Sequence, residues 1–106
     1  MAWIALIVAG LFEIVWAYFM KQSAGFTRLW PSVATLGFMG VSFALLSFSM
    51  KSLPMGTAYT VWTGIGAVGA FVVGVVVLHE HLSLARVAAA VLIVAGLILM
   101  RLAPAQ

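Results

Sequence analysis

The chain has 106 residues, of which 66% are hydrophobic and only 7% are charged. A soluble domain of this size carries about 25% charged residues, so this composition excludes an ordinary water-soluble fold and indicates that lipid covers most of the surface. Cysteine is absent, which excludes disulfides. The formal net charge is +3, but the basic residues stand singly at the ends of apolar runs, a pattern typical of membrane flanks and not of nucleic-acid binding.

Four apolar runs follow one another along the chain, at residues 2–20, 30–50, 55–78 and 83–101. Each run approaches the ~20 residues that an α-helix needs to cross about 30 Å of hydrocarbon, and none alternates with period two as a barrel strand does. The connections are short, so consecutive helices are expected to be antiparallel neighbours. We therefore predict one all-α transmembrane domain, 1–106, whose first run is a retained helix and not a cleaved signal peptide.

Lysine and arginine hardly distinguish the two ends of the predicted bundle. The end with both termini and the second loop carries Lys51 and Arg101, and the opposite end carries Lys21, Arg28 and Arg86. Because this asymmetry sets the orientation of a membrane protein, a nearly balanced count predicts insertion in both orientations and an antiparallel, dual-topology homodimer. The alternative is that the small bias still fixes one orientation.

Glu13 lies in the middle of the first apolar run. An ionisable side chain at that depth costs about 3 kcal/mol or more, and all the basic residues flank the runs and lie at other depths. Burial without a partner favours the protonated carboxyl, so Glu13 is expected to exchange a proton for a cation near neutral pH. We interpret it as the substrate- and proton-binding group of a cation carrier. The alternative is a permanently protonated side chain that donates a hydrogen bond between helices.

Small, aromatic and hydroxyl side chains from three runs are expected to surround this carboxyl. A carboxylate fixed by hydroxyl and indole donors beside aromatic faces binds a small organic cation by charge pairing and cation–π contact. Ordinary helix packing of the aromatics, and a serine hydroxyl bonded back to its own helix, are the alternatives. The predicted surround consists of Gly10, Trp16, Ser42, Tyr59, Trp62 and Thr63.

Small residues in the last two runs have a further interpretation. Gly64 and Gly66 weaken a helix and permit a kink, so we predict a hinge there, with close helix packing as the alternative. Ala89 and Gly96 lie seven residues apart and form a small-residue stripe that suits the dimer contact. The group His79-Glu80-His81 is expected to be a solvated loop, because this spacing chelates a metal poorly. The sequence has no nucleophile triad, phosphate loop or zinc motif, so we predict neither an enzyme nor a cofactor or metal site.

The residues described so far resemble the small multidrug resistance family of proton-coupled exporters, over nearly all of the chain. The resemblance depends on Glu13, on the loop at 21–32, which reads KQSAGFTRLWPS, and on the run at 56–66, which reads GTAYTVWTGIG. It implies a four-helix protomer in an antiparallel dimer within the bacterial inner membrane. The strings EIVWA at 13–17 and WTGIGAVG at 62–69 resemble more closely the guanidinium-exporter branch, also called SugE-like.

The resemblance also implies a mechanism. The two Glu13 carboxylates of the dimer would bind guanidinium or protons in competition, inside a surround made by Trp16, Ser42, Tyr59 and Trp62. The alternative is a multidrug exporter of quaternary ammonium compounds that uses the same glutamate. Two alternatives belong to another class. A passive channel predicts uncoupled conductance, and a non-transporting structural or regulatory membrane peptide predicts that Glu13→Gln changes no flux. The histidines beside Glu80 depart from the family pattern.

Overall fold

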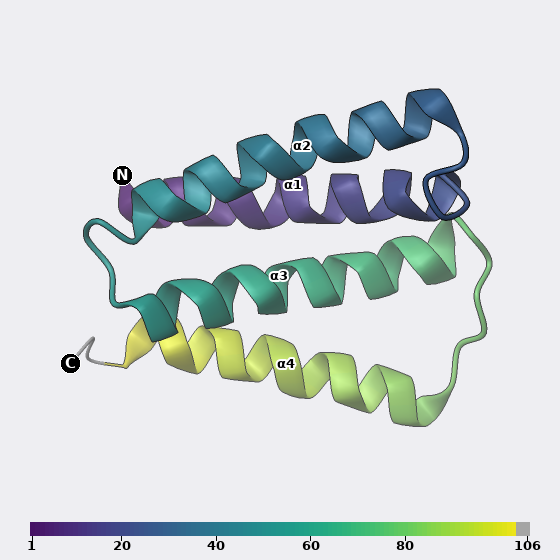
Figure 1. Ribbon diagram of the computed structural model, residues 1–106. Coiled ribbons are helices and arrows are strands. Elements are labelled where there is room, and N and C mark those ends of the chain that lie inside the picture. The colour runs from purple at the N-terminus through teal and green to yellow at the C-terminus, as the bar shows by residue number, and fades with distance from the viewer. Residues whose placement is uncertain (104–106) are drawn as a thin grey trace.

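The computed structural model describes residues 1–103 and contains four α-helices in that range: α1 (Ala2–Gln22), α2 (Leu29–Ser49), α3 (Met55–Val76) and α4 (Leu84–Leu102). Figure 1 shows that the N-terminus, the α2–α3 loop and the end of α4 lie at one end of the molecule, with the other two loops at the opposite end. Each helix is long and apolar enough to cross a membrane. The prediction of four transmembrane-type helices is therefore confirmed.

The turn between α1 and α2 is fixed by one buried serine and three residues with positive φ. The Ser23 hydroxyl donates to the Met20 carbonyl (2.6 Å) and accepts from the Phe26 amide (3.1 Å). Ala24, Gly25 and Phe26 have φ values of 50°, 76° and 65°, a region that ends helices. The chain reverses within these few residues, and α2 then begins with Pro31 in its first turn, where proline is well tolerated.

The third helix ends at Val76, slightly before the predicted residue 78. Although Val77 and Leu78 are apolar, His79 adopts a φ of 58° and breaks the helix. The amide of Glu80 then donates to the carbonyl of Gly74 (2.9 Å), which folds the chain back over the end of α3. Hydrophobicity alone could not reveal this left-handed turn.

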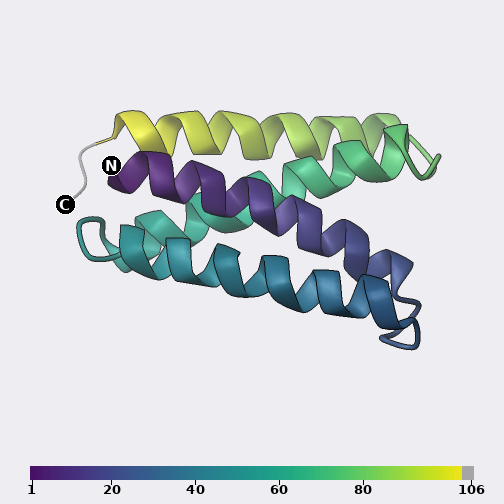
Figure 2. The same cartoon turned by 90° about the horizontal axis from the view of Figure 1, so that it is seen from above.

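The packing of the bundle is uneven. Helix α1 packs against both α2 and α3, whereas the backbone of α4 approaches only α3. Figure 2 shows from above how α1 runs beside α2 and crosses over α3. The core is a cluster between α1, α2 and α3, and α4 has no buried residue. At the end with the termini, the Arg101 guanidinium lies 4.7 Å from the centroid of the Trp3 ring and joins α4 to α1. The core residues are Leu6, Ala9, Leu46, Ala58, Val61 and Trp62.

Candidate functional site

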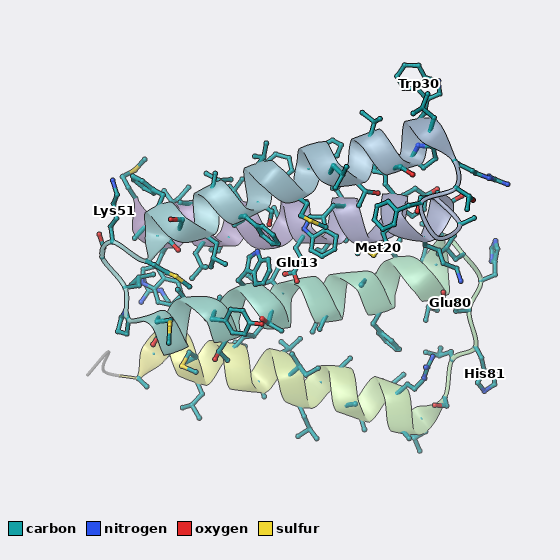
Figure 3. All side chains as sticks on the ribbon, viewed as in Figure 1. Glu13, Met20, Trp30, Lys51, Glu80 and His81 are labelled. Atoms are coloured by element: carbon teal, nitrogen blue, oxygen red, sulfur yellow. The ribbon has the colours of Figure 1, made fainter. Side chains whose placement is uncertain are left out.

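Glu13 is half-buried on the side of α1 that faces α3 (Figure 3). Its carboxyl lies against Gly66, where an added Cβ would collide with Cδ and Oε1 of Glu13. The Oε1 atom is buried and has no hydrogen-bond partner within residues 1–103. Buried polar atoms in proteins nearly always have a partner, so this unpaired oxygen marks Glu13 as the candidate binding group.

A chain of hydrogen bonds joins three helices close to this carboxyl. The Trp62 indole on α3 donates to the Ser42 hydroxyl on α2 (2.9 Å), and Ser42 donates to the Ala9 carbonyl on α1 (2.7 Å). Ala9 precedes Glu13 by four residues, so its carbonyl is also the acceptor of the Glu13 amide in a regular α-helix. The structure thus brings together two of the predicted surround residues, Ser42 and Trp62, but they bind one another and the backbone carbonyl of Ala9.

Aromatic rings pack on one another across the bundle, from Trp16 on α1 to Tyr59 on α3. The Trp16 ring meets Phe43 edge-on at 6.3 Å, Phe43 lies 5.6 Å from Trp62, and Trp62 lies 5.7 Å from Tyr59, all between ring centroids. The indole nitrogen of Trp16 is buried without a partner among the described residues. Sequence analysis missed Phe43, which connects the two tryptophans. Its position directly after Ser42 was the only available signal.

The predicted face of α3 is divided between two neighbours. Trp62 and Gly66 are buried toward α1 and α2, whereas Tyr59 and Thr63 are exposed. Tyr59 and Thr63 line a cavity of about 470 Å³ between α3 and α4, together with Gly96. Two of the predicted hydroxyls therefore open onto the α3–α4 groove.

The glycines expected near the site are sites of close helix packing. A Cβ at Gly10 would lie 2.6 Å from Cγ2 of Ile65, and one at Gly64 would lie 2.5 Å from Cδ2 of Leu97. Helix α3 runs without a break through Gly64 and Gly66, so a hinge there stays a prediction.

The predicted dimer residues, Ala89 and Gly96, line the grooves between α3 and α4. A Cβ at Gly96 would meet no heavy atom of residues 1–103 within 4 Å, and Ala89 is exposed at the edge of another cavity. Their role in a dimer also stays a prediction. Within the described residues, no three His, Cys, Asp or Glu side chains are grouped closely enough to hold a metal ion.

The sequence of the chain matches a known protein family. A model of the Small Multidrug Resistance protein family matches residues 1–93. The chain is 56% identical over 103 residues to a protein of Yersinia pseudotuberculosis named "Guanidinium exporter", covering 97% of this chain and 99% of that relative. Relatives with the same name in Salmonella typhimurium (55% over 102 residues) and Escherichia coli K12 (56% over 102 residues) cover 96% of this chain and 97% of their own length. With four helices apolar enough to span a bilayer, the chain is a multi-pass membrane protein that belongs to the small multidrug resistance family.

Proposed function

We propose that this protein is an antiporter that exports guanidinium and small guanidinyl cations in exchange for protons, and that both ligands compete for Glu13. The observation that carries the proposal is the Glu13 carboxyl, whose buried Oε1 has no partner among residues 1–103. Relatives that are more than half identical bear the name "Guanidinium exporter", which supports guanidinium as the substrate.

The chemistry around Glu13 suits this cation. Guanidinium is planar and weakly hydrated, and it pairs with a carboxylate through two parallel hydrogen bonds. The rings of Trp16, Phe43 and Trp62, which pack on one another across α1, α2 and α3, offer faces for cation–π contact. Ionised Glu13 binds the cation, whereas protonated Glu13 has no charge to pair with it. Because one group serves both ligands, neither crosses without displacing the other, and this competition is the coupling.

We further propose that two copies assemble as an antiparallel homodimer, with both Glu13 side chains at one central site. The support is the absence of any buried residue on α4, the unfilled space next to Gly96 and the balanced distribution of basic residues. Two lysines added to one terminus should then force a single orientation. Undiminished transport by that single-orientation protein alone would contradict antiparallel pairing.

Transport in this proposal proceeds by alternating access. The Glu13 pair takes guanidinium from the cytoplasm, the dimer rocks, and the cation leaves on the other side as protons enter. Bending of α3 at Gly64 and Gly66 would let one half of the helix move relative to the other.

The test is guanidinium-driven proton movement in proteoliposomes. The wild-type protein should move protons against a guanidinium gradient, and Glu13→Gln should abolish this flux. Tetraphenylphosphonium serves as the competing substrate, because coupled flux with that cation and none with guanidinium would favour the multidrug alternative. A conductance without proton coupling would favour a channel and would contradict the antiporter.

A further inference from the structure

Glu80 is the second of the chain's two acidic residues, and its side chain lies outside the site described so far. It was expected in a solvated loop, and it is exposed, but the structure holds it in place. Its amide donates to the Gly74 carbonyl (2.9 Å). Its carboxylate lies against Gly74, where an added Cβ would collide with Oε1 of Glu80. The positive φ of His79 turns the chain so that this contact forms.

Both acids therefore lie against glycines of α3. Glu13 contacts Gly66 and Glu80 contacts Gly74, and eight residues of α-helix correspond to about 12 Å along the axis. One carboxylate lies at the middle of the helix, and the other lies at the end where the α1–α2 and α3–α4 loops are found, as Figure 3 shows.

A cavity of about 200 Å³ follows the groove between α1 and α3 from one acid toward the other. It begins at Ile14, the residue after Glu13, passes the small side chains of Ala17 and Ala70, and reaches Lys21 and Glu80. A single water needs only about 10–15 Å³ by the same measure, so the cavity has room for several waters or a small planar cation. It extends from the loop end of the bundle to Ile14, the residue that follows Glu13 on α1.

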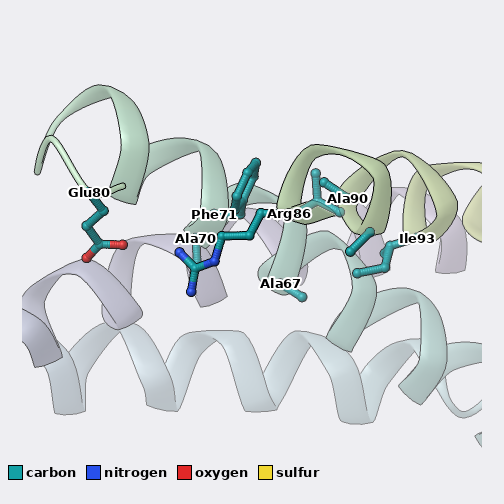
Figure 4. Close-up of a pocket in the computed structure, with 9 residues that line it drawn as sticks. Ala67, Ala70, Phe71, Glu80, Arg86, Ala90 and Ile93 are labelled. Carbon is teal, nitrogen blue, oxygen red and sulfur yellow. The ribbon is translucent and has the colours of Figure 1, made fainter. Parts of the chain in front are cut away.

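Glu80 lies between two positively charged side chains at the loop end of the bundle, one in each of two cavities. Lys21 lines the cavity with Glu80. A second cavity of about 390 Å³ between α3 and α4 is lined by Glu80 and Arg86. Figure 4 shows the Arg86 guanidinium and the Glu80 carboxylate extending toward the same space. Without Glu80, the loop end would carry Lys21 in the α1–α3 groove and Arg86 in the α3–α4 cavity, two positive charges that repel an approaching cation.

We propose that Glu80 is a peripheral cation-attracting residue, which offsets Lys21 in the α1–α3 groove and Arg86 in the adjoining α3–α4 cavity and so admits guanidinium toward Glu13. This inference rests on the proposed function. Glu80 acts on the approach of the cation and leaves the exchange step at Glu13 unaffected. Its effect is therefore electrostatic, and salt screens it.

The experiment measures guanidinium-driven proton flux in proteoliposomes at about 0.01 M and about 1 M ionic strength, where the Debye length is about 30 Å and about 3 Å. Glu80→Gln should raise KM for guanidinium about threefold at low salt, the effect of one unit charge at ~6 Å in a water-like medium, with kcat unchanged. The difference should disappear at high salt. Lys21→Gln should shift KM in the opposite direction, and Glu80→Asp should restore the wild-type value. All assays are run at one and the same pH.

The matched control is His81→Gln, a neutral change in the same exposed loop, which should leave KM unaltered. An unchanged KM for Glu80→Gln at low salt would overturn the inference, as would a loss of kcat at constant KM, which indicates a structural role. Flux by the wild type that depends on Glu13 keeps the proposed function intact in either case. Absence of guanidinium flux in the wild type would overturn both.

Discussion

Replacing Gly66 by alanine tests whether the position of the Glu13 carboxyl, and not only its presence, determines transport. The added Cβ would collide with Cδ and Oε1 of Glu13, so the carboxyl must move to another rotamer. Moving the end of a flexible side chain costs about 0.5–1.5 kcal/mol. Alanine in a helix interior is more favourable than glycine by roughly 0.5–1 kcal/mol, which offsets that cost. The stability of the variant should therefore lie within about 1 kcal/mol of the wild type.

Transport should respond much more strongly than stability. A shift of a binding group by about 1 Å can lower the rate of the step it supports up to about 100-fold, so we expect guanidinium flux in Gly66→Ala to fall at least about tenfold. Gly37→Ala is the matched control, because a Cβ at Gly37 meets no heavy atom of residues 1–103 within 4 Å. The assays are proteoliposome flux and thermal unfolding in detergent. Wild-type flux in Gly66→Ala would refute the reasoning, and so would equal losses in both variants.

Three further predictions concern the residues around this carboxyl. Ser42→Ala leaves the Trp62 indole without its acceptor and should lower the unfolding free energy in detergent by about 0.6–2 kcal/mol. The control is Ser47→Ala on the exposed side of the same helix. Equal stability of the two variants would contradict a stabilising role of the Trp62–Ser42 hydrogen bond. Phe43→Leu keeps an apolar side chain but removes the ring between the tryptophans, so KM for guanidinium should rise about two- to fivefold, and an unchanged KM would remove Phe43 from the site. Lowering the pH protonates Glu13 and should weaken guanidinium binding, by about tenfold per pH unit once the proton form dominates; binding titrations that show no pH dependence would contradict competition.

The four helices followed from the sequence because each apolar run has the length of a membrane span and contains almost no charge. The choice of Glu13 as the candidate site residue followed for a related reason. A lone acid in such a run has a large desolvation cost, and ordinary helix packing does not need an acid there. Neither prediction needed to know how one helix faces another. That is why both could be made from a single sequence.

The contacts between helices could not be predicted in the same way. A soluble helix shows its buried side through a polar opposite face, but these helices are apolar all round, so nothing in the sequence indicated that Ser42 would reach the Ala9 carbonyl. For the same reason, the sequence did not indicate that Phe43 would lie between Trp16 and Trp62. Gly66 was interpreted as part of a hinge, and only the structure reveals that its missing side chain makes room for Glu13.

The backbone turn after α3 could not be predicted either. The backbone turn at His79 is unusual for a residue with a side chain, and no pattern in the sequence marked it. As a result, Glu80 was expected to be an ordinary loop residue, whereas it lies against Gly74 beside the groove.

Proton release on guanidinium binding tests most directly whether one membrane-embedded acid trades a hydrogen ion for an organic cation. Isothermal titration calorimetry in two buffers of different ionisation enthalpy counts the protons released by the purified protein. We predict release on binding by the wild type, and neither binding nor release in Glu13→Gln. The account would be contradicted if guanidinium bound and no proton were released at any pH between about 5 and 9. This range spans the titration of carboxyls in perturbing environments.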